Sequence, residues 1–137
     1  MREILNDIFT WPWFSEPHGY NFNGHLIRHP NGNLCIDPVE PGEDGLDEIV
    51  RLGVSHILLT NRNHSRASNK LREHTGARTS IHPDDAAHAR DQGTMLDDAS
   101  RWGRSSALWW WWRPPESRPE KWHSTGRGGV FSSSAMP

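Results

Sequence analysis

Apolar and polar residues follow regular patterns as far as residue 98 and lose this order afterwards. Two β-type runs, at residues 24–29 and 33–37, flank the turn sequence Pro-Asn-Gly at residues 30–32. An Asn-Gly pair between two such runs is a strong signal for a β-hairpin. Because proline cannot donate a hydrogen bond to a strand ladder, Pro38 ends the second run. We therefore predict an antiparallel strand pair here.

The next segment alternates between helical and strand patterns. Leu46, Ile49 and Val50 lie on or near one face of a helix, and Gly53 follows as a C-cap. By the same criteria, the expected helices cover residues 43–52, 65–74 and 83–90, and the expected strands cover residues 54–60 and 77–81. Helices and strands joined by short connections are typical of an α/β fold.

The two ends of the chain lack this regularity. Residues 1–19 are aromatic and irregular in pattern, so we expect an irregular arm in extended form or a first strand. After residue 98 neither the strand nor the helix period continues, and four consecutive tryptophans at 109–112 precede a proline-rich stretch. The expected organisation is an arm at 1–19, a partial α/β domain at 20–98 and a disordered or non-native tail at 99–137.

Composition and charge narrow the classes of partner. The formal net charge is −2 with basic and acidic residues intermixed, so no basic stripe indicates nucleic acid. No apolar run approaches the roughly 18 residues that span a bilayer, and the first residues lack the apolar stretch of a signal peptide. We expect a cytoplasmic protein with no nucleic-acid or membrane partner.

The single cysteine, Cys35, excludes an internal disulfide framework. Its neighbours Leu34 and Ile36 predict a small apolar side chain in a strand, with a reactive thiol as the alternative.

One strand-to-helix junction contains the residues that are candidates for a functional site. The apolar run Ile-Leu-Leu at 57–59 ends in Thr60, and the polar sequence Asn-Arg-Asn-His-Ser-Arg follows at 61–66. This resembles the metallo-β-lactamase superfamily, in which such a junction holds the metal motif Thr-His-x-His-x-Asp-His. Residues 23–38 are similar to the opening hairpin of that family. The resemblance covers about residues 20–98. It implies the N-terminal half of an αββα sandwich, and hydrolysis of esters, thioesters, amides or phosphoesters by metal-bound hydroxide.

The register of this motif decides what chemistry the resemblance supports. With Thr60 on the motif threonine, the ligand positions are occupied by Asn61, Asn63, Ser65 and Arg66. Zinc requires imidazole, thiolate or carboxylate donors, whereas an arginine is a fixed cation. We therefore expect no bound zinc or other cofactor and a catalytically inactive protein.

Three interpretations of the same turn stay open. His64 is a weak metal candidate with Asp37 or His82 as helpers, or else a histidine hydrogen-bonded to backbone, with the neighbouring Asn and Ser side chains as helix N-caps. Alternatively, the turn forms a non-catalytic binding module for a small anionic ligand. The candidate ligand-binding residues are Asp37, Asn61, Arg62, Asn63, His64 and Arg66.

The tail is consistent with translation in a shifted frame. Tryptophan has a single codon, so the nucleotide sequence that encodes residues 109–112 is known from the protein sequence. Read in the frame that starts at the last base of each codon, this nucleotide sequence encodes Val-Val-Val. Synonymous codons for the following residues permit strings that resemble later motifs of the same family, with the frame change near residues 100–102. The alternative is a native Trp/Pro-rich binding tail. A half-domain exposes one apolar sheet face, so we expect poor solubility or self-association. A product without function is the third interpretation, beside the degenerate hydrolase and the binding module.

Overall fold

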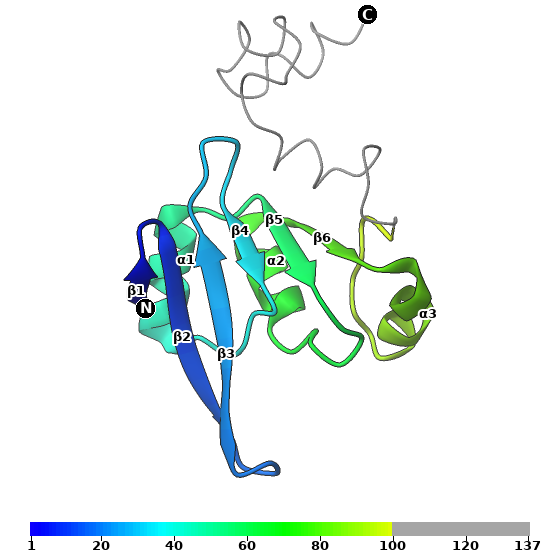
Figure 1. Cartoon of the computed structure of the whole chain (residues 1–137). Helices are drawn as coiled ribbons and strands as arrows, with labels where there is room; N and C mark the ends of the chain where they lie inside the picture. Colours follow the sequence, from blue (N-terminus) through cyan, green and yellow to red (C-terminus); the bar gives the residue numbers. More distant parts are fainter. Residues whose placement is uncertain (100–137) are drawn as a thin grey trace, which may run out of the picture. The chain divides into compact units, whose positions relative to one another are not determined.

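The computed structural model describes residues 1–99 (Figure 1). The predictions about a disordered or non-native tail and a shifted frame concern residues outside this range.

These residues form a mixed α/β fold around one six-stranded sheet with the strand order β1-β2-β3-β4-β5-β6. The strands are β1 (Arg2–Leu5), β2 (Ile8–Ser15), β3 (Tyr20–Ile27), β4 (Leu34–Ile36), β5 (His56–Leu59) and β6 (Arg78–Ile81). The helices are α1 (Gly42–Leu52), α2 (Ser68–Thr75) and α3 (Pro83–Asp91). Strands β1 to β4 pair antiparallel, and β4, β5 and β6 pair parallel. The predicted α/β class is confirmed.

The first nineteen residues contain the strands β1 and β2, so the expectation of an irregular arm is wrong and that of a first strand holds. Strand β2 pairs with β3 along its whole length, and the two run out together as a long hairpin (Figure 1). Pro12 is what obscured β2 in the sequence. Strand β1 pairs with β2 only as far as Thr10, so Pro12 lies where β2 has a free edge and tolerates a missing donor.

The predicted antiparallel pair after Gly24 is confirmed, because Leu26 pairs with Cys35 in the β3–β4 register. Its connection is longer than a two-residue Asn-Gly turn. It runs over residues 28–33 and contains a turn in which the amide of Gly32 donates to the carbonyl of His29 at 3.0 Å. Gly32 has φ +112°, a conformation that favours glycine.

Both crossover helices pack on the same face of the sheet. The units β4-α1-β5 and β5-α2-β6 run in the same direction, and right-handed crossovers place α1 and α2 on one side. On that face Cys35 and Ile57, which are paired in register, pack with Ile49 of α1 and Leu71 of α2 in the core. Cys35 is fully buried, and burial raises the pKa of its thiol. Cys35 is therefore an apolar strand residue, and the reactive-thiol alternative is wrong.

The start of α2 decides whether the motif residues lie in a helix or in a turn. It begins at Ser68, later than the expected residue 65, so the motif residues 61–66 lie in an irregular turn between β5 and α2. Helices α1 and α3 differ from the prediction by one residue at one end. Within residues 1–99, no helix combines the length and the apolar character needed to cross a bilayer.

Candidate functional site

Asp37 links the end of β4 to the end of β5 through hydrogen bonds of its side chain. Its carboxylate accepts a hydrogen bond from the backbone amide of Thr60 at 2.8 Å and another from the Thr60 hydroxyl. The backbone of Asp37 has φ +45°, in the left-handed region that Asp tolerates better than most residues. Hydrogen bonds to an ionised acceptor are stronger than neutral ones and offset the cost of this conformation.

The imidazole of His64 belongs to the same cluster. Its Nδ1 lies 3.1 Å from Asp37 Oδ2 and 3.2 Å from Thr60 Oγ1. Because a carboxylate only accepts, Nδ1 carries the proton and donates to Asp37. The ring is therefore bonded to side chains, and the expected bond to backbone is wrong.

His82, the other expected helper, is engaged elsewhere. It is the N-cap residue of α3, and its Nδ1 accepts from the amide of Asp84 at 3.2 Å. The structure thus brings together His64 and Asp37 but gives His82 a capping role.

The asparagines and Arg62 stabilise the turn itself. Asn61 Oδ1 accepts from the amide of Asn63 at 2.8 Å, which is the geometry of an Asx turn. Neither residue caps α2, whose N-cap position is Ala67 without a side-chain hydrogen bond. The expected role as helix caps is therefore wrong. Arg62 Nε donates to Asp85 at 2.6 Å and ties the turn to α3.

Arg66 occupies a different environment. Its guanidinium carbon lies 4.0 Å from the centre of the Phe22 ring, within the range of a cation–π interaction. Together with Trp13, Glu40 and Ala67 it lines a cavity of about 280 Å³. Trp13 and Phe22 come from β2 and β3, and the sequence patterns did not connect them to this turn.

A family model described as the metallo-beta-lactamase superfamily matches residues 2–98. The chain belongs to this superfamily. The match includes β1 and β2 as well as the strands that the sequence resemblance covered. No curated protein matches the chain.

In the register inferred from the sequence, with Thr60 on the motif threonine, the metal-motif positions of the superfamily correspond to the turn just described. Thr60 follows the last residue of β5, as the motif threonine requires, and is held there by Asp37. Asn61 and Asn63 then bond to each other within the turn, and Arg66 stacks on Phe22. These positions thus carry internal contacts of the protein itself.

The motif turn and the rest of residues 1–99 do not offer a ligand set suited to a zinc ion. Zinc sites in proteins use at least three imidazole, thiolate or carboxylate ligands. Within residues 1–99, no three His, Cys, Asp or Glu side chains come together in an arrangement suited to a metal. Asp37 and His64 form only a pair, and they are bonded to each other.

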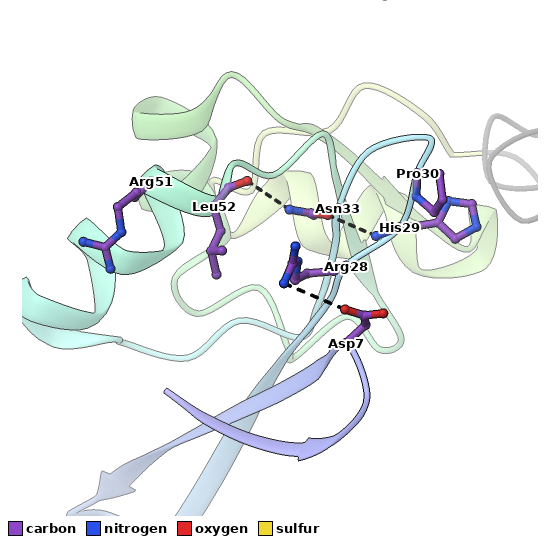
Figure 2. A pocket seen from close by; sticks show the side chains of 7 residues that line it. All are labelled: Asp7, Arg28, His29, Pro30, Asn33, Arg51 and Leu52. Atoms are coloured by element: carbon purple, nitrogen blue, oxygen red, sulfur yellow. Dashed lines mark hydrogen bonds and ion pairs between the residues drawn. The ribbon is translucent and has the colours of Figure 1, made fainter. Parts of the chain in front are cut away.

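A second cavity, of about 450 Å³, lies where the β1–β2 turn, the β3–β4 connection and the end of α1 meet. Its lining residues are Asp7, Arg28, His29, Pro30, Asn33, Arg51 and Leu52 (Figure 2). Figure 2 shows the Asn33 side chain between Leu52 at the end of α1 and His29 of its own connection: its amide donates to the carbonyl of Leu52 at 3.0 Å, and its oxygen accepts from the amide of His29 at 3.1 Å. Arg28 Nη1 lies 3.9 Å from Asp7 Oδ1, which is an ion pair across this cavity. This hollow was not indicated by any sequence pattern, because its parts are distant along the chain.

Proposed function

We propose that residues 1–98 form a degenerate superfamily domain that does not hydrolyse substrates through bound zinc. The observation that supports this proposal is the identity of the side chains in the motif turn. In the inferred register, the ligand positions are occupied by Asn61, Asn63, Ser65 and Arg66. Amides and a hydroxyl are poor zinc ligands, and a guanidinium repels a dication.

The test is a measurement of zinc binding and of zinc-dependent hydrolysis on the full chain. The protein is incubated with zinc, dialysed and assayed for zinc per chain, and for cleavage of p-nitrophenyl acetate and p-nitrophenyl phosphate. We expect far less than one zinc per chain and no rate increase with zinc. Stoichiometric zinc together with zinc-dependent cleavage refutes the proposal.

A variant with the motif donors restored provides the matched comparison. The quadruple substitution N61H/N63H/S65D/R66H places imidazole and carboxylate groups at the four motif positions. We expect this variant to retain more zinc than the wild type, because the donors then suit the metal. A His64→Ala variant of the wild type shows whether any residual zinc depends on the one remaining imidazole.

We also propose that the coding frame changes near residues 100–102, so that the chain is a truncated form of the superfamily fold. Two facts support this: the family match ends at residue 98, and the tryptophans at 109–112 encode a strand-like valine run in the shifted frame. The nucleotide sequence over codons 99–137 and the intact mass of the natural product test it. Stop codons in the shifted frame, or a natural protein carrying the Trp-rich sequence, contradict it.

A second candidate function is binding of a small anion at the same turn without any metal. The supporting observation is that Arg66 forms no hydrogen bond or ion pair with any residue of 1–99, whereas Arg62 is neutralised by Asp85. Of the six expected binding residues, Arg66 therefore offers the cation. Salt-sensitive binding of small carboxylates that is lost in Arg66→Gln supports this function, and its absence in the folded wild type excludes it.

A further inference from the structure

The helix-side face of the β2–β3 hairpin is a row of aromatic side chains. Residues two apart in a strand share a face, so Trp11 and Trp13 point to the same side as their partners Gly24 and Phe22. The Trp11 ring lies over Gly24, where a Cβ atom at 2.5 Å from the ring would not fit, and its Nε1 donates to the carbonyl of Val39 at 2.9 Å. Trp11 is thus buried in the core, and its ring covers the part of this face at Gly24.

Farther out on the hairpin, Trp13 and Phe22 form the next pair. Their ring centres are 6.4 Å apart with an interplanar angle of 27°. Arg66 covers the Phe22 ring at 4.0 Å. A guanidinium stacked on an aromatic ring is restricted in position while its N–H groups, which lie in its plane, remain available.

Arg66 forms no ion pair within residues 1–99, whereas Glu40, which lines the same cavity, is paired with Lys70. Glu40 Oε1 accepts from Lys70 Nζ at 2.7 Å and from the amide of Gly42 at 3.3 Å. By contrast, no acidic side chain of the described residues pairs with Arg66. Of the described residues that line the cavity, Arg66 therefore supplies a cation with free donors beside the indole of Trp13, and the carboxylate of Glu40 is held by Lys70.

The size of the cavity restricts its occupant. Its volume of about 280 Å³ is just below the range of about 300–1,000 Å³ that is usual for small-molecule sites. Such a space suits one ring with a short substituent and is too small for a folded partner. A carboxylate matches the planar fork of a guanidinium through two parallel hydrogen bonds. A planar ring attached to it has the indole of Trp13 as an apolar wall.

We propose that the cavity lined by Trp13, Glu40, Arg66 and Ala67 binds a small aromatic carboxylate, with the carboxylate on Arg66 and the ring against Trp13. This inference rests on the anion-binding candidate function and names its ligand class. It also assigns a role to the hairpin, which the motif positions do not include.

The test measures benzoate binding to the full chain at low salt by isothermal titration calorimetry, with acetate and benzamide as probes that lack the ring or the charge. We expect benzoate to bind at least about tenfold more tightly than either probe, because each removes one of the two contacts. Arg66→Gln is expected to weaken benzoate binding about tenfold or more, and Trp13→Leu to weaken it while leaving acetate unchanged.

Arg90→Gln is the matched control. It removes the same charge from an exposed arginine of α3 that does not line the cavity. Benzoate affinity in this variant is expected to equal that of the wild type, and thermal melts verify that all variants are folded. Equal weakening by Arg66→Gln and Arg90→Gln overturns the assigned site, because it indicates a general charge effect.

The probes separate this inference from the function on which it rests. Equal binding of acetate and benzoate overturns the aromatic ligand class but leaves anion binding at Arg66. No binding of either anion to the folded wild type overturns both. Neither result affects the zinc measurement, which tests the loss of hydrolysis independently.

Discussion

Asp37 shows how much a single residue contributes to the architecture of the site. It immediately follows β4, and its amide donates to the carbonyl of Leu58 in β5 at 3.0 Å. Its carboxylate holds both the amide and the hydroxyl of Thr60, and it accepts from His64. Next to it, the carbonyl of Pro38 accepts from the amide of Ala67 at 3.1 Å. Asp37 and Pro38 therefore support the motif turn at its beginning and at its end.

Substitution of Asp37 should destabilise the fold. We expect Asp37→Ala to lower the free energy of unfolding by about 2–3 kcal/mol, because the Thr60 donors lose their acceptor and alanine resists the left-handed conformation. Asp37→Asn should cost less, since Asn tolerates this conformation and keeps one acceptor oxygen. Urea denaturation followed by circular dichroism measures both. A loss below about 0.5 kcal/mol for Asp37→Ala contradicts the supporting role, since that is the size of an ordinary surface substitution.

At the scale of elements, Asp97 joins three parts of the fold. Its carboxylate pairs with Arg72 of α2, and it accepts from the amide of Thr79 in β6 at 2.8 Å. Its own amide donates to the carbonyl of Thr79 at 2.9 Å, and the next residue, Asp98, forms a parallel bridge with Ser80. The segment after α3 is thus attached to the edge of the sheet by backbone hydrogen bonds and by a charged side chain.

This attachment predicts a dependence of stability on pH. The hydrogen bond from Arg72 lowers the pKa of Asp97 from 3.8 to about 2. Because the folded-state pKa lies below the ordinary value, the stabilisation is fully present above about pH 4 and is lost as the pH falls towards 2. We expect the difference in unfolding free energy between the wild type and Asp97→Asn to shrink over this interval. Urea titrations at several values between pH 2 and 5 measure it, and a constant difference rules out the pair as its cause.

For the whole molecule, the two faces of the sheet differ in what packs on them. The core face carries Leu26, Cys35 and Ile57 against the helices. The register places Ile36 and Leu58 on the opposite face, where both are partly exposed and neither belongs to the core cluster. A sheet with partly exposed aliphatic residues on one side has apolar surface available for association.

We therefore expect the full chain to self-associate. Sedimentation velocity should show a sedimentation coefficient that rises with protein concentration, and Leu58→Lys should reduce this rise by placing a charge on the sheet face. The control is Val50→Lys, at an exposed apolar position of α1, which should leave the concentration dependence unchanged. A wild type that stays monomeric at all concentrations contradicts the expectation.

Much of the fold could be predicted from local patterns. Periodicity located all three helices and the strands from β3 to β6 within a few residues, because each pattern reflects which side of an element is buried. Strand β2 was obscured because Pro12 is acceptable only at a free edge, and whether an edge is free depends on where β1 ends. The start of α2 shifted because the motif turn satisfies its backbone groups internally, as in the bond between Asn61 and Asn63.

The sequence by itself determined the α/β class and the location of the polar turn after the apolar run at 57–59, because both depend on order and spacing along one segment. Only the tertiary structure decided which side chains meet. The pairing of Asp37 with His64 requires β4 and β5 to lie side by side, and the cavity at Arg66 requires the hairpin that carries Trp13 and Phe22 to lie over the turn before α2. Contacts between residues far apart in the chain arise from packing, and local hydrophobic patterns record burial without naming the partner.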